Sequence, residues 1–222
     1  MQELKSKIIS LNVKIFAKLK HVYVTKFGPV VRSFNSPTFP KNPNGKILVH
    51  IGCGELNDAR FINIDARAMP HVHYISKSLE LAQFSNNSID LIYACHVLEH
   101  LSHRKLLSTL SNWFSRLKNG GVLRLSVPNF DTIIEIYQDN EKSVDAIKLP
   151  LLGGQEDEFN YHAAVFNYNS LYGLLNRCGF TTIREWNPKS APYYNFDDWA
   201  GRKFIVGGKE YKLSLNLEAI RK

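Results

Sequence analysis

The sequence predicts an α/β protein built on a mainly parallel sheet. Short apolar runs of four to six residues recur along the chain, and segments with helical periodicity separate some of them. Turn-forming Gly, Asn and Asp residues close most of these runs. Strands that alternate with helices pair in parallel and are covered on both faces. A chain of 222 residues is long enough for one domain with a large core.

The apolar runs give the order of the expected elements. They predict strands over 47–51, 61–64, 72–75, 89–94, 122–127, 181–186 and 211–220. Apolar residues at helical spacing predict helices over 106–117 and 170–178. Asn119-Gly120-Gly121 is expected to end the first helix, and Gly179 the second.

Composition excludes several classes of protein. A hydrophobic fraction of 44% with 22% charged residues is typical of a globular chain, and no apolar run is long enough to span a membrane. The three cysteines are scattered and form no Cys-x-x-Cys pair, which argues against a disulfide framework and a zinc ribbon. Lysines interrupt the N-terminal apolar residues, so no secretory signal is predicted and a cytoplasmic location is expected.

Positive charge is concentrated at the N-terminus. The net charge is +8, and residues 1–46 hold nine Lys and Arg against one acid, so the rest of the chain is neutral. Leu4, Ile8, Leu11, Ile15 and Leu19 follow helical spacing, which predicts a basic amphipathic helix.

The uneven charge divides the chain into a basic first part and a neutral second part, and three roles are possible for the first part. We expect a basic arm and Pro-rich linker over 1–45, followed by a single domain over 46–222. The helix within residues 1–27 could pack on that domain, lie on the anionic inner face of a membrane or bind nucleic acid. Packing on the domain would need no partner molecule.

A glycine loop and an acid mark the candidate binding site. Gly52-Cys53-Gly54 directly follows the first predicted strand, where glycine permits a sharp turn and the close approach of a ligand. Asp65 ends the second predicted strand, and a carboxylate there can accept hydrogen bonds from both hydroxyls of a ribose.

Several motifs in order resemble the class I S-adenosyl-L-methionine (SAM) dependent methyltransferases. The resemblance rests on Ile51-Gly52-Cys53-Gly54, Ile62-Asn63-Ile64-Asp65, Asn87 to Tyr93, His96-Val97-Leu98-Glu99-His100, Leu117 to Leu123 and Val127-Pro128. Further similarity to the small methyltransferases associated with bacterial surface-polysaccharide biosynthesis lies at Gly153-Gly154-Gln155, Tyr161-His162, Phe166 and Cys178-Gly179-Phe180. The resemblance implies a Rossmann-like, seven-stranded, mainly parallel sheet of the class I methyltransferase type.

The resemblance also implies how SAM would be bound. Gly52, Cys53 and Gly54 would line its methionine and ribose end, and Asp65 would hold the ribose hydroxyls. The remaining contacts would come from Ser78 and Leu79 near the adenine and from the backbone at Cys95 and His96 near the methionine part.

Three departures from the family pattern are visible. His50 stands where many relatives have an acid, and Ser78 where an Asp is common. Only 11 positions separate Gly54 from Asp65, too few for a full helix and a strand. The helix that usually follows the glycine loop is therefore predicted to be absent or a single turn.

The expected reaction is O-methylation of a sugar hydroxyl in a glycan or glycolipid precursor. Such a hydroxyl is a poor nucleophile until its proton is removed, and an imidazole suits this task near neutral pH. His96 is the first candidate base and His162 the second. Tyr161, Asp198 and Trp199 are candidates for shaping the acceptor pocket, with ordinary packing as the alternative.

Other interpretations stay open. His96, Glu99 and His100 spell H-x-x-E-H, which can bind zinc on a helix, but the segment directly follows a strand and the methyltransferase pattern explains it, so no metal is predicted. The main alternatives in function are an RNA methyltransferase that uses the basic arm, and a binding module that keeps the fold without turnover. Nothing in the sequence indicates the oligomeric state.

Overall fold

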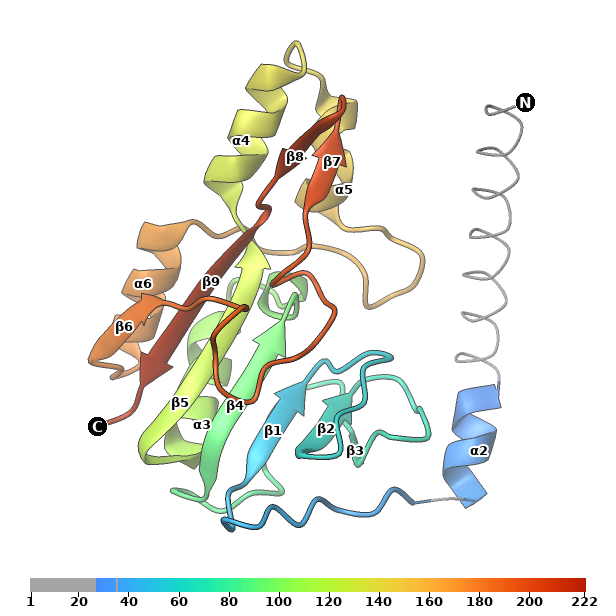
Figure 1. Ribbon diagram of the computed structural model, residues 1–222, viewed down its shortest axis with the longest axis vertical. Helices are drawn as coiled ribbons and strands as arrows, with labels where there is room; N and C mark the ends of the chain where they lie inside the picture. The colour runs from blue at the N-terminus through green and yellow to red at the C-terminus, as the bar shows by residue number, and fades with distance from the viewer. Residues whose placement is uncertain (1–26, 35) are drawn as a thin grey trace.

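The computed structural model describes residues 27–34 and 36–222 and confirms the predicted sheet (Figure 1). Seven strands lie in the order β3-β2-β1-β4-β5-β9-β6, and β9 alone is antiparallel to its neighbours. The strands of this sheet are β1 (Leu48–Ile51), β2 (Phe61–Asp65), β3 (Tyr74–Ile75), β4 (Ile89–Cys95), β5 (Leu117–Pro128), β6 (Thr182–Glu185) and β9 (Ser214–Ile220).

The helices and a separate hairpin complete the described chain. The helices are α2 (Gly28–Phe34), the short 3₁₀ turn η2 (Leu98–His100), α3 (Leu106–Arg116), α4 (Phe130–Asp139), α5 (Val144–Leu152) and α6 (Tyr168–Arg177). The hairpin pairs β7 (Phe204–Val206) with β8 (Lys209–Tyr211). Among the described residues, no helix has the length and apolar character that crossing a membrane requires.

Most predicted elements lie where the sequence places them, with three differences. Helix α2 occupies part of the expected linker, with Pro29 in its first turn. The helix over 106–117 ends at Arg116, so Asn119-Gly120-Gly121 lies within the long strand β5. The strand expected over 211–220 divides into the end of β8 and all of β9. The amphipathic helix expected over residues 1–27 lies outside the described residues, apart from Phe27.

The two faces of the sheet are covered differently. On one face, α3 and α6 bury the main core, with Trp113 and Leu175 fully enclosed. On the other face, the irregular segment 187–203 crosses in front of β4 and β5 (Figure 1). Its aromatic residues pack on the sheet, and Phe196 stacks on Tyr93 with ring centroids 5.2 Å apart. Helices therefore cover one face, and an aromatic loop covers the other.

A small cap stands beyond the tips of β4 and β5 (Figure 1). Helices α4 and α5 and the β7–β8 hairpin share their own apolar cluster, which includes Ile133, Ile147 and Tyr211. Neither α4 nor α5 was among the predicted helices. Pro150 interrupts the helical pattern of α5, whereas α4 is as long as α6 and buries Ile133 and Ile136. The cap matters because it forms one wall of the cleft described below.

The ends of β1 and β4 approach each other closely. Gly52 has φ +63°, and a Cβ atom there would lie 2.3 Å from Cγ2 of the buried Val97. Only glycine tolerates both that distance and that backbone conformation. No helix lies between β1 and β2, as the short spacing predicts, so the loop after β1 packs directly on the turn after β4.

We expect Gly52→Ala to lower the free energy of unfolding by about 2–4 kcal/mol, through left-handed backbone strain and overpacking against Val97. Urea unfolding followed by tryptophan fluorescence measures this loss. Val97→Ala in the same chain should recover the packing part, so the double variant loses less than the sum of the single variants.

Gly45→Ala is the matched control. Gly45 also has positive φ (+66°), but nothing lies within 4 Å of its added Cβ, so this variant reports backbone strain alone. Equal losses at Gly45 and Gly52, with no coupling to Val97, would contradict the close contact.

Candidate active site

A cleft of about 650 Å³ opens at the carboxyl ends of β1 and β4. After β1, the chain forms β2 and β3 on one side of β1 and then crosses to the other side to form β4. β1 and β4 are therefore neighbours at the point where the strand order changes direction. Residues that follow both strands line the cleft, including Gly52, Gly54, Cys95 and His96. Ligands of open parallel α/β sheets bind at this topological position, and the volume suits a small molecule.

The amides of the glycine loop are all used inside the protein. The N–H groups of Gly52 and Cys53 donate to the carbonyl of Ile64 at 2.8 and 3.2 Å. The N–H of Gly54 donates to Oδ2 of Asp65 at 2.8 Å. Phosphate-binding glycine loops instead present free amides at the N-terminus of a helix. This loop has neither feature, so it is not built to bind a phosphate.

Asp65 shapes the loop. Its Oδ1 accepts from the N–H of Arg67 at 2.9 Å and from Arg67 Nε at 3.3 Å. With the bond from Gly54, three of about four acceptor positions on the carboxylate are occupied. Asp65 is buried behind the loop and does not line the cleft. Its contact with a ribose therefore stays a prediction, while its hold on Gly54 is structural.

The space beside Gly54 fits a bound cofactor. A Cβ atom at Gly54 would meet only Nη2 of Arg67, at 3.6 Å, so internal packing does not require glycine there. The residue has φ +53° and faces the cleft. The Cys53 side chain is buried with Met69 and Val72, and burial raises the pKa of its thiol. The loop therefore presents backbone atoms to a ligand in the cleft, as the predicted binding of SAM requires.

The other residues predicted to bind SAM differ in position. Cys95 lines the cleft, and burial raises the pKa of its thiol, which keeps it protonated. Ser78 is exposed and Leu79 is buried, and neither lines the cleft. The Leu79 carbonyl accepts from Nε1 of Trp113 at 2.8 Å. The contact of Ser78 and Leu79 with an adenine ring stays a prediction.

His96 lies in the cleft with one nitrogen occupied. Its Nε2 lies 2.9 Å from Oγ of Ser214, whose hydroxyl donates to the carbonyl of Trp199 at 2.7 Å. Nε2 must therefore carry the proton, and Nδ1 is the basic nitrogen. Burial, with smaller contributions from neighbouring histidines, lowers the pKa of His96 to about 3, so the ring is neutral at pH 7. The ring also stacks on Trp199 at 5.9 Å.

His100 and His162 lie side by side in the same cleft. Their ring centroids are 5.0 Å apart. Nδ1 of His100 bonds to the carbonyl of Tyr161, and Nδ1 of His162 to that of Pro150, each at 3.1 Å. A carbonyl only accepts, so both rings carry the proton on Nδ1 and keep a lone pair on Nε2. Burial, followed by the neighbouring His100, lowers the pKa of His162 to about 4.

Backbone hydrogen bonds bring His162 to this place. The carbonyl of Glu99 accepts from the N–H groups of Ala163 and Ala164 at 2.7 and 3.1 Å. The N–H of His162 donates to the carbonyl of Leu152 at 3.0 Å. These bonds hold the segment after α5 against η2, so residues far apart in the sequence share one wall of the cleft.

Sequence reasoning missed much of the outer wall. The cap contributes Leu149 and Phe204, and the irregular segment contributes Asp197 and Arg202. Gly153 was named only as part of the family resemblance; in the structure it has φ +80° after α5, and a Cβ atom there would overlap the Asn160 carbonyl.

The three candidates for the acceptor pocket have different positions. Trp199 lines the cleft, and Tyr161 is exposed outside it. Asp198 also lines the cleft but is buried, and its carboxylate accepts from the hydroxyls of Tyr93 and Tyr194 at 2.5 and 2.6 Å. Of the two residues that line the cleft, Trp199 is the more exposed.

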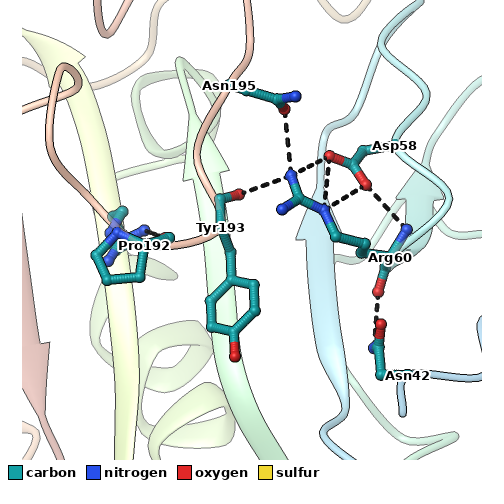
Figure 2. A network of polar contacts seen from close by, with 7 residues as sticks. Asn42, Asp58, Arg60, Pro192, Tyr193 and Asn195 are labelled. Carbon is teal, nitrogen blue, oxygen red and sulfur yellow. Dashed lines mark hydrogen bonds and ion pairs between the residues drawn. The ribbon is translucent and has the colours of Figure 1, made fainter. Parts of the chain in front are cut away.

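An arginine network fixes the segment that carries these residues (Figure 2). Arg60 Nε donates to Asp58 at 2.9 Å, and Arg60 Nη2 donates to Oδ1 of Asn195 at 3.2 Å and to the carbonyl of Tyr193 at 3.5 Å. The Asn42 side chain donates to the Arg60 carbonyl at 3.0 Å. The segment before β1, the loop before β2 and the loop before Asp197 are thereby tied together.

Solved structures with a similar fold are SAM-dependent methyltransferases. One from Archaeoglobus fulgidus is 16% identical with a TM-score of 0.51, over 79% of this chain and 86% of the other. One from Methanosarcina mazei is 14% identical with a TM-score of 0.51, over 87% and 97%. One from Thermotoga maritima is 15% identical with a TM-score of 0.50, over 94% and 97%. At these identities the similarity shows the fold.

No curated protein matches the sequence. The family described as "Methyltransferase domain" matches residues 29–185, which is well over half of the chain. This match and the shared fold agree with SAM as the expected cofactor and with the predicted class I methyltransferase fold. The chain therefore belongs to the methyltransferase domain family.

Proposed function

We propose that the protein transfers the methyl group of SAM to a hydroxyl of a sugar, in a glycan or glycolipid precursor. The glycine loop is the observation that supports the cofactor site. Gly52 and Gly54 have no side chains to keep a ligand from the backbone, and the three N–H groups of the loop already donate within the protein, so none is left to bind a phosphate. This arrangement argues against a dinucleotide cofactor and suits the methionine and ribose parts of SAM. Family membership supports the same assignment.

The roles of the protein's residues follow from their positions. SAM supplies a methyl group on a positively charged sulfur, which is a good leaving group. Gly52 and Gly54 bind the methionine end, and the backbone at Cys95 and His96 closes the opposite side of the cleft. Holding the acceptor oxygen in line with the methyl carbon can supply most of the acceleration.

The outer cleft suits a sugar better than a polyanion. Trp199 and Phe159 offer aromatic faces. Carboxylates outnumber arginines in the lining, which includes Glu55, Glu156, Asp157, Asp197 and Asp198 against Arg67 and Arg202. Sugar hydroxyls donate hydrogen bonds to carboxylates, whereas the phosphates of RNA are repelled by them. The wall therefore supports a glycan acceptor and gives no support to RNA.

His162 is the stronger candidate for receiving the hydroxyl proton. His162 lines the cleft with its proton on Nδ1, so its Nε2 can accept a proton, while the basic Nδ1 of His96 lies 3.3 Å from Glu99. We therefore rank His162 above His96, the reverse of the order that the sequence favours.

Calorimetric titration with S-adenosylhomocysteine, the demethylated product of SAM, tests the cofactor site. We expect binding by the wild type and at least tenfold weaker binding by Gly54→Val, whose side chain would enter the cleft. Gly120→Val is the matched control, since Gly120 also has positive φ (+78°) with nothing near its Cβ, but lies away from the cleft.

Failure of the wild type to bind, or equal losses in the folded Gly54 and Gly120 variants, would remove the loop as the cofactor site. Circular dichroism establishes that each variant is folded.

Tritium-labelled SAM and a panel of free, nucleotide-linked and lipid-linked sugars test the acceptor. With the best acceptor, we expect His162→Ala to lower kcat by about 10²–10⁴ with little change in SAM affinity, and His96→Ala to lower it less. A larger loss in His96→Ala would restore the order that the sequence predicts. Transfer to none of the sugars would contradict a glycan acceptor.

The basic arm suits an acceptor at the cytoplasmic leaflet. Residues 1–27 hold six lysines and one acid, and each lysine near an anionic surface contributes about 1 kcal/mol. We expect the full chain to co-sediment with vesicles that contain phosphatidylserine at low salt, and to be released as the salt concentration rises.

Removal of residues 1–27 should abolish this sedimentation and leave product binding intact, because the cofactor residues all follow Lys46. Equal sedimentation of the truncated chain would show that the arm is not the membrane contact. Loss of solubility on truncation would show that the arm packs on the domain.

A further inference from the structure

Three side chains with metal-ligating atoms meet at the base of the cleft. Glu99, His100 and His162 each offer one ligand atom, and these atoms all lie within 4.8 Å of one another. The two histidines line the cleft, and Glu99 lies behind them with 1% of its surface exposed. The mechanism of methyl transfer proposed above gives no role to Glu99 or His100.

Glu99 is a buried carboxylate without a hydrogen-bond partner among the described residues. Neither Oε1 nor Oε2 has one. Nδ1 of His96 lies 3.3 Å from Oε1, but is not aligned for a hydrogen bond. Burial of a carboxylate whose oxygens have no hydrogen-bond partner is costly. A bound cation would offset that cost.

The two histidines are oriented as metal ligands usually are. In both, the Nδ1–H donates to a backbone carbonyl, which fixes the ring and leaves the Nε2 lone pair available. Backbone bonds from Ala163 and Ala164 to Glu99 hold the two halves of the cluster together.

We propose that Glu99, His100 and His162 bind a divalent transition-metal ion. Two imidazole nitrogens and one carboxylate suit Mn²⁺, Fe²⁺, Co²⁺ or Zn²⁺ rather than Ca²⁺ or Mg²⁺, which prefer oxygen ligands. Two of the three ligands, His100 and His162, line the cleft, so an ion that they bind would be accessible from it. A site that is open on one side keeps a coordination position for substrate.

The role of the ion in catalysis rests on the proposed function. The acceptor oxygen binds the ion, which lowers the pKa of the hydroxyl so that its proton leaves to solvent. The oxygen then forms a bond to the methyl carbon while the carbon–sulfur bond breaks, and the electron pair remains on sulfur. With the ion bound, the Nε2 lone pair of His162 is a metal ligand and cannot also receive the hydroxyl proton. The ion therefore takes the place of the base proposed above, and removal of His162 lowers kcat by removing the ion.

Calorimetric titration of the EDTA-treated, dialysed full chain with Mn²⁺ and with Zn²⁺ tests the site. We expect one ion per chain and at least tenfold weaker binding in His100→Gln, His162→Gln and Glu99→Gln. His103→Gln is the matched control, because His103 is an exposed histidine close to the cluster in sequence but outside the cleft. The ions should also raise the melting temperature of the wild type, and much less that of the three variants.

Absence of binding by the wild type, or equal binding by all three folded variants, would overturn the site. The same protein in EDTA is titrated with S-adenosylhomocysteine. Product binding without metal binding would contradict the metal site alone, and metal binding without product binding would contradict the proposed function alone.

Discussion

The contact between Gly52 and Val97 is the constraint on which the cleft depends. It joins the loop after β1 to the turn after β4 at a distance that excludes any Cβ atom on Gly52. Because no helix follows the glycine loop, this contact and the bond from Gly54 to Asp65 fix its position. His96, directly before Val97, is thereby held across the cleft from the loop.

The internal use of the loop amides separates this site from phosphate-binding sites on similar sheets. A Gly-x-Gly sequence after a first strand is compatible with several cofactors, since the glycines only permit a close approach. Here Ile64 and Asp65 on β2 accept the bonds that a phosphate would otherwise accept. The second strand therefore decides what kind of ligand the first loop can bind.

Sequence patterns predicted the parts of the fold that local rules control. Apolar runs predicted the seven strands of the sheet, and the spacing from Gly54 to Asp65 predicted that no full helix lies between β1 and β2. The cap and the aromatic segment 187–203 depend on contacts between distant residues, such as Phe196 on Tyr93, which no local pattern reveals. For the same reason, no local pattern shows that backbone bonds to Glu99 place His162 beside His100.

The central claim is that the cleft between the ends of β1 and β4 binds SAM. The most direct measurement is a titration of the ¹⁵N-labelled chain with S-adenosylhomocysteine, followed by the amide resonances. If SAM binds in this cleft, we expect saturable shifts at Gly52, Cys53, Gly54 and His96, with little change at Lys209 in the distant hairpin. Shifts confined to other parts of the chain, or no shifts at saturating concentration, would contradict it.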